Sequence, residues 1–221
     1  MKTLKLHNNN ERIPIGKIIC IGRNYVEHAK ELKSEVPKAP ILFLKPSSAV
    51  IFDGEPILKP RISNDLQHEV ELVVAIADTC KNVTESDALN HVLGYGVGLD
   101  MTLRDIQNSL KDKGLPWFIS KGFDTSAPLS EFVPAAKITD PRNLEIRCAV
   151  NGTLRQQTKV SDMIFPVEKL ISYITTLNTL ERGDLIYTGT PHGVAKVVPG
   201  DTITAELVGY TNISHEIRDA V

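Results

Sequence analysis

The sequence lacks the residues that would mark a disulfide-rich or zinc-stapled protein. Only three cysteines occur among 221 residues, at positions 20, 80 and 148. An odd number cannot all pair, and no two have the short spacing of a zinc-ligand pair, so a disulfide framework and a structural zinc site are excluded. We expect three buried, reduced thiols.

The chain also lacks an excess of charge and any long apolar run. Lys and Arg total 25 against 27 Asp and Glu, a net charge of -2. Such a chain offers no electrostatic reason to bind nucleic acid or an anionic membrane, so we expect neither partner. The longest purely apolar run, residues 72–77, is too short to span a bilayer.

The first residues show no targeting pattern. Residues 1–16, MKTLKLHNNNERIPIG, contain acidic and Asn residues and no apolar stretch. This composition fits neither a secretory signal nor a transit peptide. We therefore expect a cytoplasmic protein, with residues 1–16 as an N-terminal extension and residues 17–221 as a single domain.

What the chain has in quantity is short apolar segments separated by turn residues. Hydrophobic residues make up 42% and charged residues 24%, as in ordinary globular proteins. Strands are predicted at 17–21, 41–44, 69–76, 94–99, 144–150, 154–158, 185–188, 202–207 and 212–218. Helices are predicted at 24–34, from 84, at 102–114 and at 166–178. Strands outnumber helices without alternating regularly with them, which predicts a β-rich α+β fold.

Three acidic residues at strand positions suggest a metal site. Glu69 and Glu71 project from the same face of a predicted strand because side chains alternate. Asp100 follows a glycine-rich strand. Three carboxylates without nearby cysteine suit Mg²⁺ or Mn²⁺ better than zinc. The alternatives are an exposed acidic strand face for the two glutamates and a simple turn role for Asp100.

Two further segments could carry catalysis. His28 and Glu31 are three residues apart in a predicted helix, so the carboxylate can orient the imidazole as a base. A surface ion pair is the alternative. Lys121 stands in an aromatic, apolar stretch at 116–123, where it could contact a substrate anion or simply extend to solvent.

Taken together, these segments resemble the fumarylacetoacetate hydrolase family, in its compact acylpyruvase branch. The resemblance covers most of the chain. The matching blocks are GRNYVEHAKE at 22–31, LFLKP at 42–46, HEVELVV at 68–74, GYGVGLDMTLRDIQ at 94–107, KGLPWFISKGFD at 113–124, VNGTLRQ at 150–156 and DLIYTGTPHGV at 184–194.

The resemblance implies a fold, an assembly and a set of site residues. The implied fold is a mixed β-roll or sandwich in one catalytic domain, and the implied assembly is a homodimer with Mg²⁺, or Mn²⁺, in each subunit. By position, Glu69, Glu71 and Asp100 correspond to metal ligands, and His28, Glu31 and Lys121 to catalytic residues. The residues corresponding to substrate contacts are Arg23, Arg104, Gln107 and Thr190.

The implied activity is Mg²⁺-dependent hydrolysis of a carbon–carbon bond in acylpyruvate-type 2,4-dioxo acids, with oxaloacetate decarboxylation as a further activity. The first alternative is fumarylpyruvate hydrolysis, or 2-oxo-acid decarboxylation, isomerisation or dehydration. The second is a non-catalytic protein that binds a small 2-oxo acid, which the intact set of catalytic residues disfavours.

Overall fold

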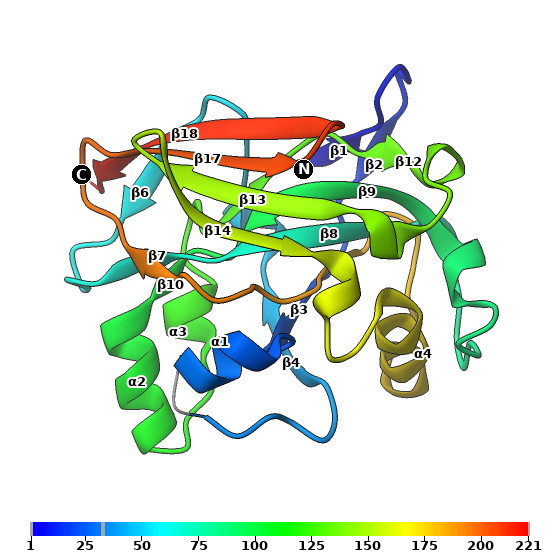
Figure 1. Ribbon diagram of the computed structural model, residues 1–221, viewed down its shortest axis with the longest axis horizontal. Helices are drawn as coiled ribbons and strands as arrows, with labels where there is room; N and C mark the ends of the chain where they lie inside the picture. The colour runs from blue at the N-terminus through cyan, green and yellow to red at the C-terminus, as the bar shows by residue number, and fades with distance from the viewer. Residues whose placement is uncertain (1, 32–33, 221) are drawn as a thin grey trace.

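The computed structural model describes residues 2–31 and 34–220, which form two large β-sheets with a group of helices at one side (Figure 1). The larger sheet is mixed and has the order β4-β3-β15-β8-β9-β11-β5, with β12 paired to β9. Its strands are β3 (Ile18–Gly22), β4 (Ile41–Lys45), β5 (Val50–Phe52), β8 (Val70–Ile76), β9 (Val92–Leu99), β11 (Ala127–Leu129), β12 (Val133–Pro134) and β15 (Leu185–Tyr187).

Strand β8 explains why this sheet forms the centre of the molecule. All seven of its residues are buried. Leu72 and Val74 pack into one apolar cluster, whereas Val73 and Ala75 pack into a second cluster on the opposite face. A strand covered on both faces has no solvent side, so its sequence shows a continuous apolar run rather than alternation.

The second sheet is the antiparallel layer that crosses the upper part of Figure 1, with one parallel strand at its edge. Its order is β14-β13-β17-β18-β6. The strands are β6 (Ile57–Lys59), β13 (Glu145–Val150), β14 (Thr153–Lys159), β17 (Thr202–Leu207) and β18 (Thr211–Asp219). Asn151 and Gly152, which join β13 to β14, have φ values of 50° and 75°, the backbone that a tight two-residue hairpin requires.

Short strands complete the fold. One small sheet has the order β10-β7-β16, with β7 (Leu66–His68), β10 (Thr102–Leu103) and β16 (Ala195–Lys196). Residues near the N-terminus form the hairpin β1 (Thr3–Lys5) and β2 (Arg12–Pro14), which buries Leu4 and Ile13 in the second apolar cluster. These five short strands were not predicted, because two or three residues with few apolar neighbours carry too little pattern.

Four α-helices lie among the described residues: α1 (Val26–Glu31), α2 (Arg104–Asp112), α3 (Phe118–Lys121) and α4 (Val167–Leu177). Helices α1, α2 and α3 gather at one end of the large sheet, at the lower left of Figure 1. No described helix has the length and apolar character to cross a membrane.

The helix predicted from residue 84 does not form. Backbone bonds from Asp87 to Thr84 and from Asn90 to Asp87 join residues three apart, and only a short 3-10 helix, Ala88–His91, follows. The Thr84 hydroxyl donates to the Asp87 carboxylate at 2.7 Å, so these side chains stabilise a turn. Helices are present at the other three predicted places, as α1, α2 and α4. Of the helix predicted at 24–34, residues 26–31 are helical, and residues 32–33 lie outside the described part of the chain. The nine predicted strands are present, and the β-rich α+β fold is confirmed.

Candidate active site

The three predicted acidic ligands meet where β8 and β9 pair. Glu69 precedes β8, Glu71 lies within it, and Asp100 directly follows β9. The antiparallel register places Glu71 opposite Gly98, so the chain beyond β9 returns toward Glu69. One carboxylate oxygen of each of the three residues lies within 4.8 Å of the others, and all three side chains are buried.

Gly98 allows close packing in this region rather than contact with a ligand. A Cβ atom at Gly98 would lie 2.7 Å from the Tyr187 ring and 2.8 Å from Val73. The glycine-rich strand therefore lets β9 pack tightly against its neighbours, which fixes the position of Asp100 at its end.

Cations pair with two of the three acids. The Lys121 ammonium donates to Glu69 Oε2 at 2.7 Å and to Asp100 Oδ2 at 2.6 Å. Arg104 also donates to Glu69. Burial by itself would raise the pKa of Glu69, but Lys121 and Arg104 outweigh burial and hold that pKa well below its usual range. Burial would likewise lower the pKa of Lys121, yet Asp100 and Glu69 raise it.

Glu71 is the acid without a cationic side-chain partner among the described residues. It accepts one hydrogen bond, from the Gly189 backbone N–H to Oε2 at 2.8 Å. Burial, together with the charges of Asp100 and Glu69, raises its pKa well above the usual range. Asp100 Oδ1 is also buried without a well-aligned hydrogen bond, although Lys45 Nζ lies 2.7 Å away. A hard divalent cation fits this set of oxygen donors because it would compensate these charges together.

The predicted catalytic pair lies in helix α1. His28 Nδ1 is 3.2 Å from Glu31 Oε2, and the Gly193 backbone N–H donates to Glu31 Oε1 at 3.1 Å. His28 is buried and lines the same cavity as Glu69 and Glu71. Burial lowers the pKa of His28, while Glu69 and Glu31 partly offset this effect. A neutral imidazole held by a carboxylate can accept a proton.

Asn24 is the first residue of the helix predicted at 24–34, a position where Asn commonly caps the first turn. In the structure its side chain has a different role. It is fully buried, and its amide donates to Thr188 O at 2.8 Å and to Phe165 O at 3.0 Å. Its Oδ1 accepts from Phe165 N–H at 2.8 Å. Asn24 therefore fastens the segment before α1 to two other parts of the chain, and this anchors the helix that carries His28.

The four residues predicted to contact substrate all line the cavity: Arg23, Arg104, Gln107 and Thr190. Arg104 lies in α2 and donates to Gln107 Oε1 at 2.5 Å and to Gln67 Oε1 at 2.9 Å. The enclosed space is about 20 Å³, which suits a water molecule and no substrate. A substrate must therefore displace part of the wall.

Sequence reasoning missed two buried polar residues next to this site. Lys45 ends β4, and its ammonium contacts Asp100 and donates to the Met101 and Lys121 carbonyls. A lysine that ends an apolar strand, as in residues 41–45, is a signal that could have been used. Its side chain is fully buried, so its partner had to be an acid.

Gln156, in β14, is the second missed residue. Its Oε1 accepts from Val70 N–H at 3.1 Å and lies 2.9 Å from His68 Nδ1. Its amide donates to Thr190 Oγ1 and Pro191 O, both at 2.9 Å. Gln156 thus joins the start of β8 to the loop that carries Thr190. No local pattern marks it, because its neighbours in β14 are also polar.

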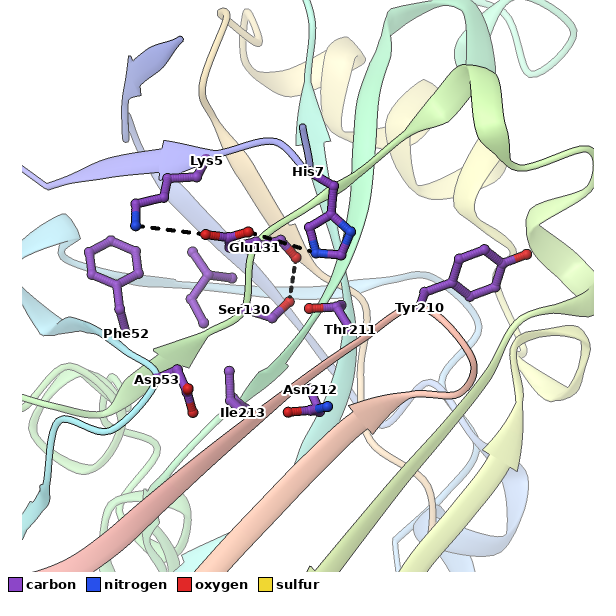
Figure 2. A pocket seen from close by; sticks show the side chains of 11 residues that line it. Lys5, His7, Phe52, Asp53, Ser130, Glu131, Tyr210, Thr211, Asn212 and Ile213 are labelled. Atoms are coloured by element: carbon purple, nitrogen blue, oxygen red, sulfur yellow. Dashed lines mark hydrogen bonds and ion pairs between the residues drawn. The ribbon is translucent and has the colours of Figure 1, made fainter. Parts of the chain in front are cut away.

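Two other groups of polar side chains among the described residues lie away from this cavity. One surface depression has a volume of about 460 Å³. Lys5 and His7 both lie beside Glu131 there (Figure 2). The Lys5 ammonium is 3.7 Å from the Glu131 carboxylate, and His7 Nε2 is 3.8 Å from it, so these side chains contact one another. Beyond the end of β8, Asp78, Cys80 and His91 form a mixed group in which His91 Nδ1 is 2.5 Å from Asp78 Oδ1.

Comparison with known protein families gives a match that covers most of the chain. Residues 17–218 match the family model for the C-terminal domain of fumarylacetoacetate hydrolase. The chain belongs to the fumarylacetoacetate hydrolase family. The resemblance seen in the sequence blocks is therefore confirmed.

Named relatives within the family are enzymes of small oxo acids. The chain is 46% identical over 201 residues to the mitochondrial oxaloacetate tautomerase FAHD1 of Bos taurus, covering 91% of each chain. It is 47% identical over 194 residues to a mitochondrial oxaloacetate decarboxylase of Dictyostelium discoideum, covering 87% of this chain and 89% of the relative.

A solved structure shows the same fold with a metal. Fumarylpyruvate hydrolase from Pseudomonas aeruginosa, crystallised with Mn²⁺ and pyruvate, has a TM-score of 0.95 and 34% identity. The match covers 99% of this chain and 96% of that one. A divalent metal is thus bound by a protein of this fold.

The expected cytoplasmic location is wrong by the same comparison. Both curated relatives described above carry a mitochondrial designation in their names. Within residues 1–16, β1 and β2 pack into the second apolar cluster, so the composition of this segment reflects packing and does not decide the compartment.

Proposed function

We propose that the protein is an enzyme dependent on a divalent metal that acts on small 2-oxo acids, with oxaloacetate as its first substrate. The observation that carries this proposal is one cavity lined by Glu69, Glu71, Lys121 and His28. Asp100 lies behind it in contact with Lys121, and Glu31 in contact with His28. The relatives named for oxaloacetate chemistry, and the related enzyme with Mn²⁺ and pyruvate, support the same class of substrate.

Glu69, Glu71 and Asp100 would hold the cation, with Mg²⁺ proposed as the physiological ion and Mn²⁺ as an active substitute. When bound, such a cation draws electron density from a 2-keto oxygen and its neighbouring carboxylate. Lys121 contacts two of these acids, so it would stabilise negative charge that develops on the keto oxygen. Lys121 and Arg104 lower the pKa of Glu69 and so favour its ionised form, and Lys45 contacts Asp100 and holds it in place.

In decarboxylation, the bond between C3 and the distal carboxylate breaks, and its electron pair stays on the pyruvate fragment. The released CO₂ leaves, and the fragment then takes a proton at C3. The enol and keto forms of oxaloacetate also interconvert through a state with negative charge on the keto oxygen. One proton moves between C3 and that oxygen. His28 lies in the cavity wall, and the burial that lowers its pKa favours the neutral imidazole, which could carry that proton.

A second activity is proposed because His28 is paired with Glu31. Hydrolysis of an acylpyruvate, fumarylpyruvate included, needs a water activated by a base. Glu31 orients His28, and the Gly193 N–H in turn orients Glu31. Decarboxylation needs no attacking water. The two reactions therefore depend differently on the same pair.

The test uses purified protein with Mg²⁺ or Mn²⁺, with and without EDTA. We expect metal-dependent loss of oxaloacetate, with pyruvate formed if the reaction is decarboxylation, and metal-dependent cleavage of fumarylpyruvate and acetylpyruvate. In Glu31→Gln, hydrolysis should fall by about 10²–10⁴-fold, and oxaloacetate turnover should fall much less. Glu27→Gln is the matched control, because Glu27 is exposed on the same helix and pairs with Lys30.

Absence of metal-dependent turnover with all of these substrates would show that the proposed function is wrong. Oxalate, which mimics the enolate of pyruvate, reports whether the binding site is intact. Equal losses of both activities in Glu31→Gln, at unchanged oxalate affinity, would contradict the water-activating role. Equal losses with weakened oxalate binding would show instead that Glu31 holds helix α1 in place beside the cavity.

We also propose that the enzyme is a homodimer, as expected of this family. Sedimentation at micromolar concentration should give about twice the chain mass of 24.4 kDa. A species of the single-chain mass alone would contradict this assembly.

A further inference from the structure

Two cations in the wall of the active-site cavity have no acidic partner among the described residues. They are Lys111, near the end of α2, and Arg23, between β3 and α1. Every other cation named at this site is paired: Lys121 with Glu69 and Asp100, Arg104 with Glu69, and Lys45 with Asp100. Unpaired cations in a cavity are available to bind an anionic ligand.

We propose that Lys111 and Arg23 form a subsite for a second, distal carboxylate of the substrate. The preferred class is then 2-oxo acids with a terminal carboxylate, such as oxaloacetate and fumarylpyruvate, over neutral-tailed acylpyruvates. This inference rests on the proposed function, because it assumes that the 2-oxo end lies at the acidic residues.

The position of Lys111 follows from the helix. Arg104, Gln107 and Lys111 are separated by three and four residues, which places them on one face of α2, and all three line the cavity. The Lys111 ammonium lies over the Trp117 ring, 5.3 Å from its centre. This aromatic contact orients the lysine without neutralising its charge.

The electrostatic surroundings of Lys111 show that its charge is uncompensated. Burial, followed by the charge of Arg104, lowers its pKa to about 8, and Lys121 and Arg23 act in the same direction. Glu69 is the acid that opposes this effect most, and Glu69 is already paired with Arg104 and Lys121. A bound carboxylate would offset the repulsion between these cations.

Arg23 provides an independent observation. Its Nε atom is buried and has no hydrogen-bond partner in the described structure. Its backbone adopts a φ of 58°, in the left-handed region that non-glycine residues rarely occupy. Such a backbone is retained where the surroundings impose it, and it occurs often at ligand sites. Here it directs an unpaired guanidinium to the cavity.

The charged groups at the cavity therefore fall into two groups that differ in burial. The inner group is the three buried carboxylates, which would hold a cation and, through it, the 2-oxo acid group. The outer group is the half-buried Arg23 and Lys111, two positive charges without an acidic partner among the described residues. A substrate with one carboxylate would leave the outer cations unpaired, whereas a dicarboxylic substrate would compensate both groups.

The test uses two inert ligands of equal chain length, 2-oxoglutarate with a distal carboxylate and 2-oxopentanoate without one. Calorimetry on the Mn²⁺-loaded wild-type protein should show tighter binding of 2-oxoglutarate by about 10- to 100-fold, as expected for hydrogen bonds to charged groups. Lys111→Met should remove most of this preference by weakening 2-oxoglutarate alone. Lys113→Met is the matched control, because Lys113 is exposed just beyond the same helix.

Kinetics with fumarylpyruvate and acetylpyruvate should show the same division. In Lys111→Met, KM for fumarylpyruvate should rise, and KM for acetylpyruvate should stay within about twofold, since the charge contacts only a distal carboxylate. Arg23→Met should act in the same direction. Unchanged oxalate affinity would show that the inner group remains intact, and Lys111→Gln replaces Lys111→Met if the latter does not fold.

The outcomes separate this subsite from the proposed function. Equal binding of the two ligands by the wild-type protein, or an unchanged preference in both lysine variants, would overturn the subsite while leaving 2-oxo-acid turnover in place. Failure of the metal-loaded wild-type protein to bind or convert any 2-oxo acid would overturn both proposals.

Discussion

The inner and outer walls of the active-site cavity treat charge in opposite ways. On the inner wall, strands β8 and β9 hold three buried acids, and neighbouring cations already pair with Glu69 and Asp100. On the outer wall, Arg23 and Lys111 come from a loop and a helix and have no acidic partner. The inner wall therefore lacks a positive charge beside Glu71. The outer wall lacks a negative charge beside Arg23 and Lys111.

The largest expected effect comes from the inner wall, in Glu71→Gln. Loss of a metal ligand should lower turnover by more than about 10²-fold, because losing an outer partner of a ligand alone costs about 10- to 100-fold. The metal-free variant should be more stable, by about 2–6 °C in Tm, because one of three clustered buried charges is removed. Activity assays and thermal unfolding with EDTA test this, with the exposed Glu85→Gln as control. Full activity of Glu71→Gln together with lowered stability would contradict the assignment of Glu71 as a metal ligand that lacks a cationic partner.

Gln156 tests whether the two walls depend on a shared support. Gln156→Leu should lower the free energy of unfolding by about 2–4 kcal/mol, because Val70 N–H and His68 lose their buried partner. It should also lower kcat more than it raises KM, since Thr190 loses its fixed position.

Two variants sharpen the result for Gln156. Gln156→Glu keeps the acceptor for Val70 but loses the donor to Thr190, so stability should recover more than kcat does. Gln157→Leu alters the exposed neighbour on β14 and should leave both nearly unchanged. Parallel recovery of stability and kcat in Gln156→Glu would assign Gln156 a purely structural role.

A pH profile distinguishes the outer wall from the inner one. The pKa of Lys111 is lowered to about 8, so the lysine loses its proton as pH rises above that value. KM for fumarylpyruvate should therefore rise by up to about tenfold per pH unit above pH 8, whereas KM for acetylpyruvate should not. Lys111→Met should abolish the difference between the profiles. The charged groups around Lys111 are Arg104, Glu69, Lys121 and Arg23, and each keeps its partner or charge in that variant.

The smallest expected effect concerns the fold away from both walls. His215 in β18 is buried, with Nδ1 2.7 Å from Glu55 O, and burial lowers its pKa despite the nearby charges of Asp53 and Glu55. The unfolded chain then binds a proton at a higher pH than the folded one. Stability is fully present above the ordinary value of 6.5 and is lost as pH falls through it toward the folded-state pKa. Urea unfolding between pH 7.5 and 5 should show this slope, and His215→Phe should reduce it. If His215→Phe leaves the pH dependence of stability unchanged, that dependence belongs to other histidines.

The strands and two residue pairs of the site, Glu69 with Glu71 and His28 with Glu31, could be predicted because their signals in the sequence are local. Side-chain alternation placed Glu69 and Glu71 together, and helical spacing placed His28 beside Glu31, as the structure shows. The predicted roles of these residues stay predictions until variants are measured. Where the local signal was ambiguous it misled: Asn24 matches a helix cap, yet its side chain bonds to residues more than a hundred positions away.

By itself, then, the sequence determined the strand pattern, the same-face pair of acids, the His28–Glu31 contact and membership of the family. Only the tertiary structure decided which charges find partners. Lys45 reaches Asp100 across 55 residues of chain, and Gln156 reaches His68 across 88, distances over which no sequence period operates. Whether a buried charge is paired depends on all the elements that surround it. For that reason Lys111 could be recognised only in the folded chain. The family resemblance already pointed to Arg23 as a substrate contact, but only the folded chain shows that Arg23 has no acidic partner among the described residues.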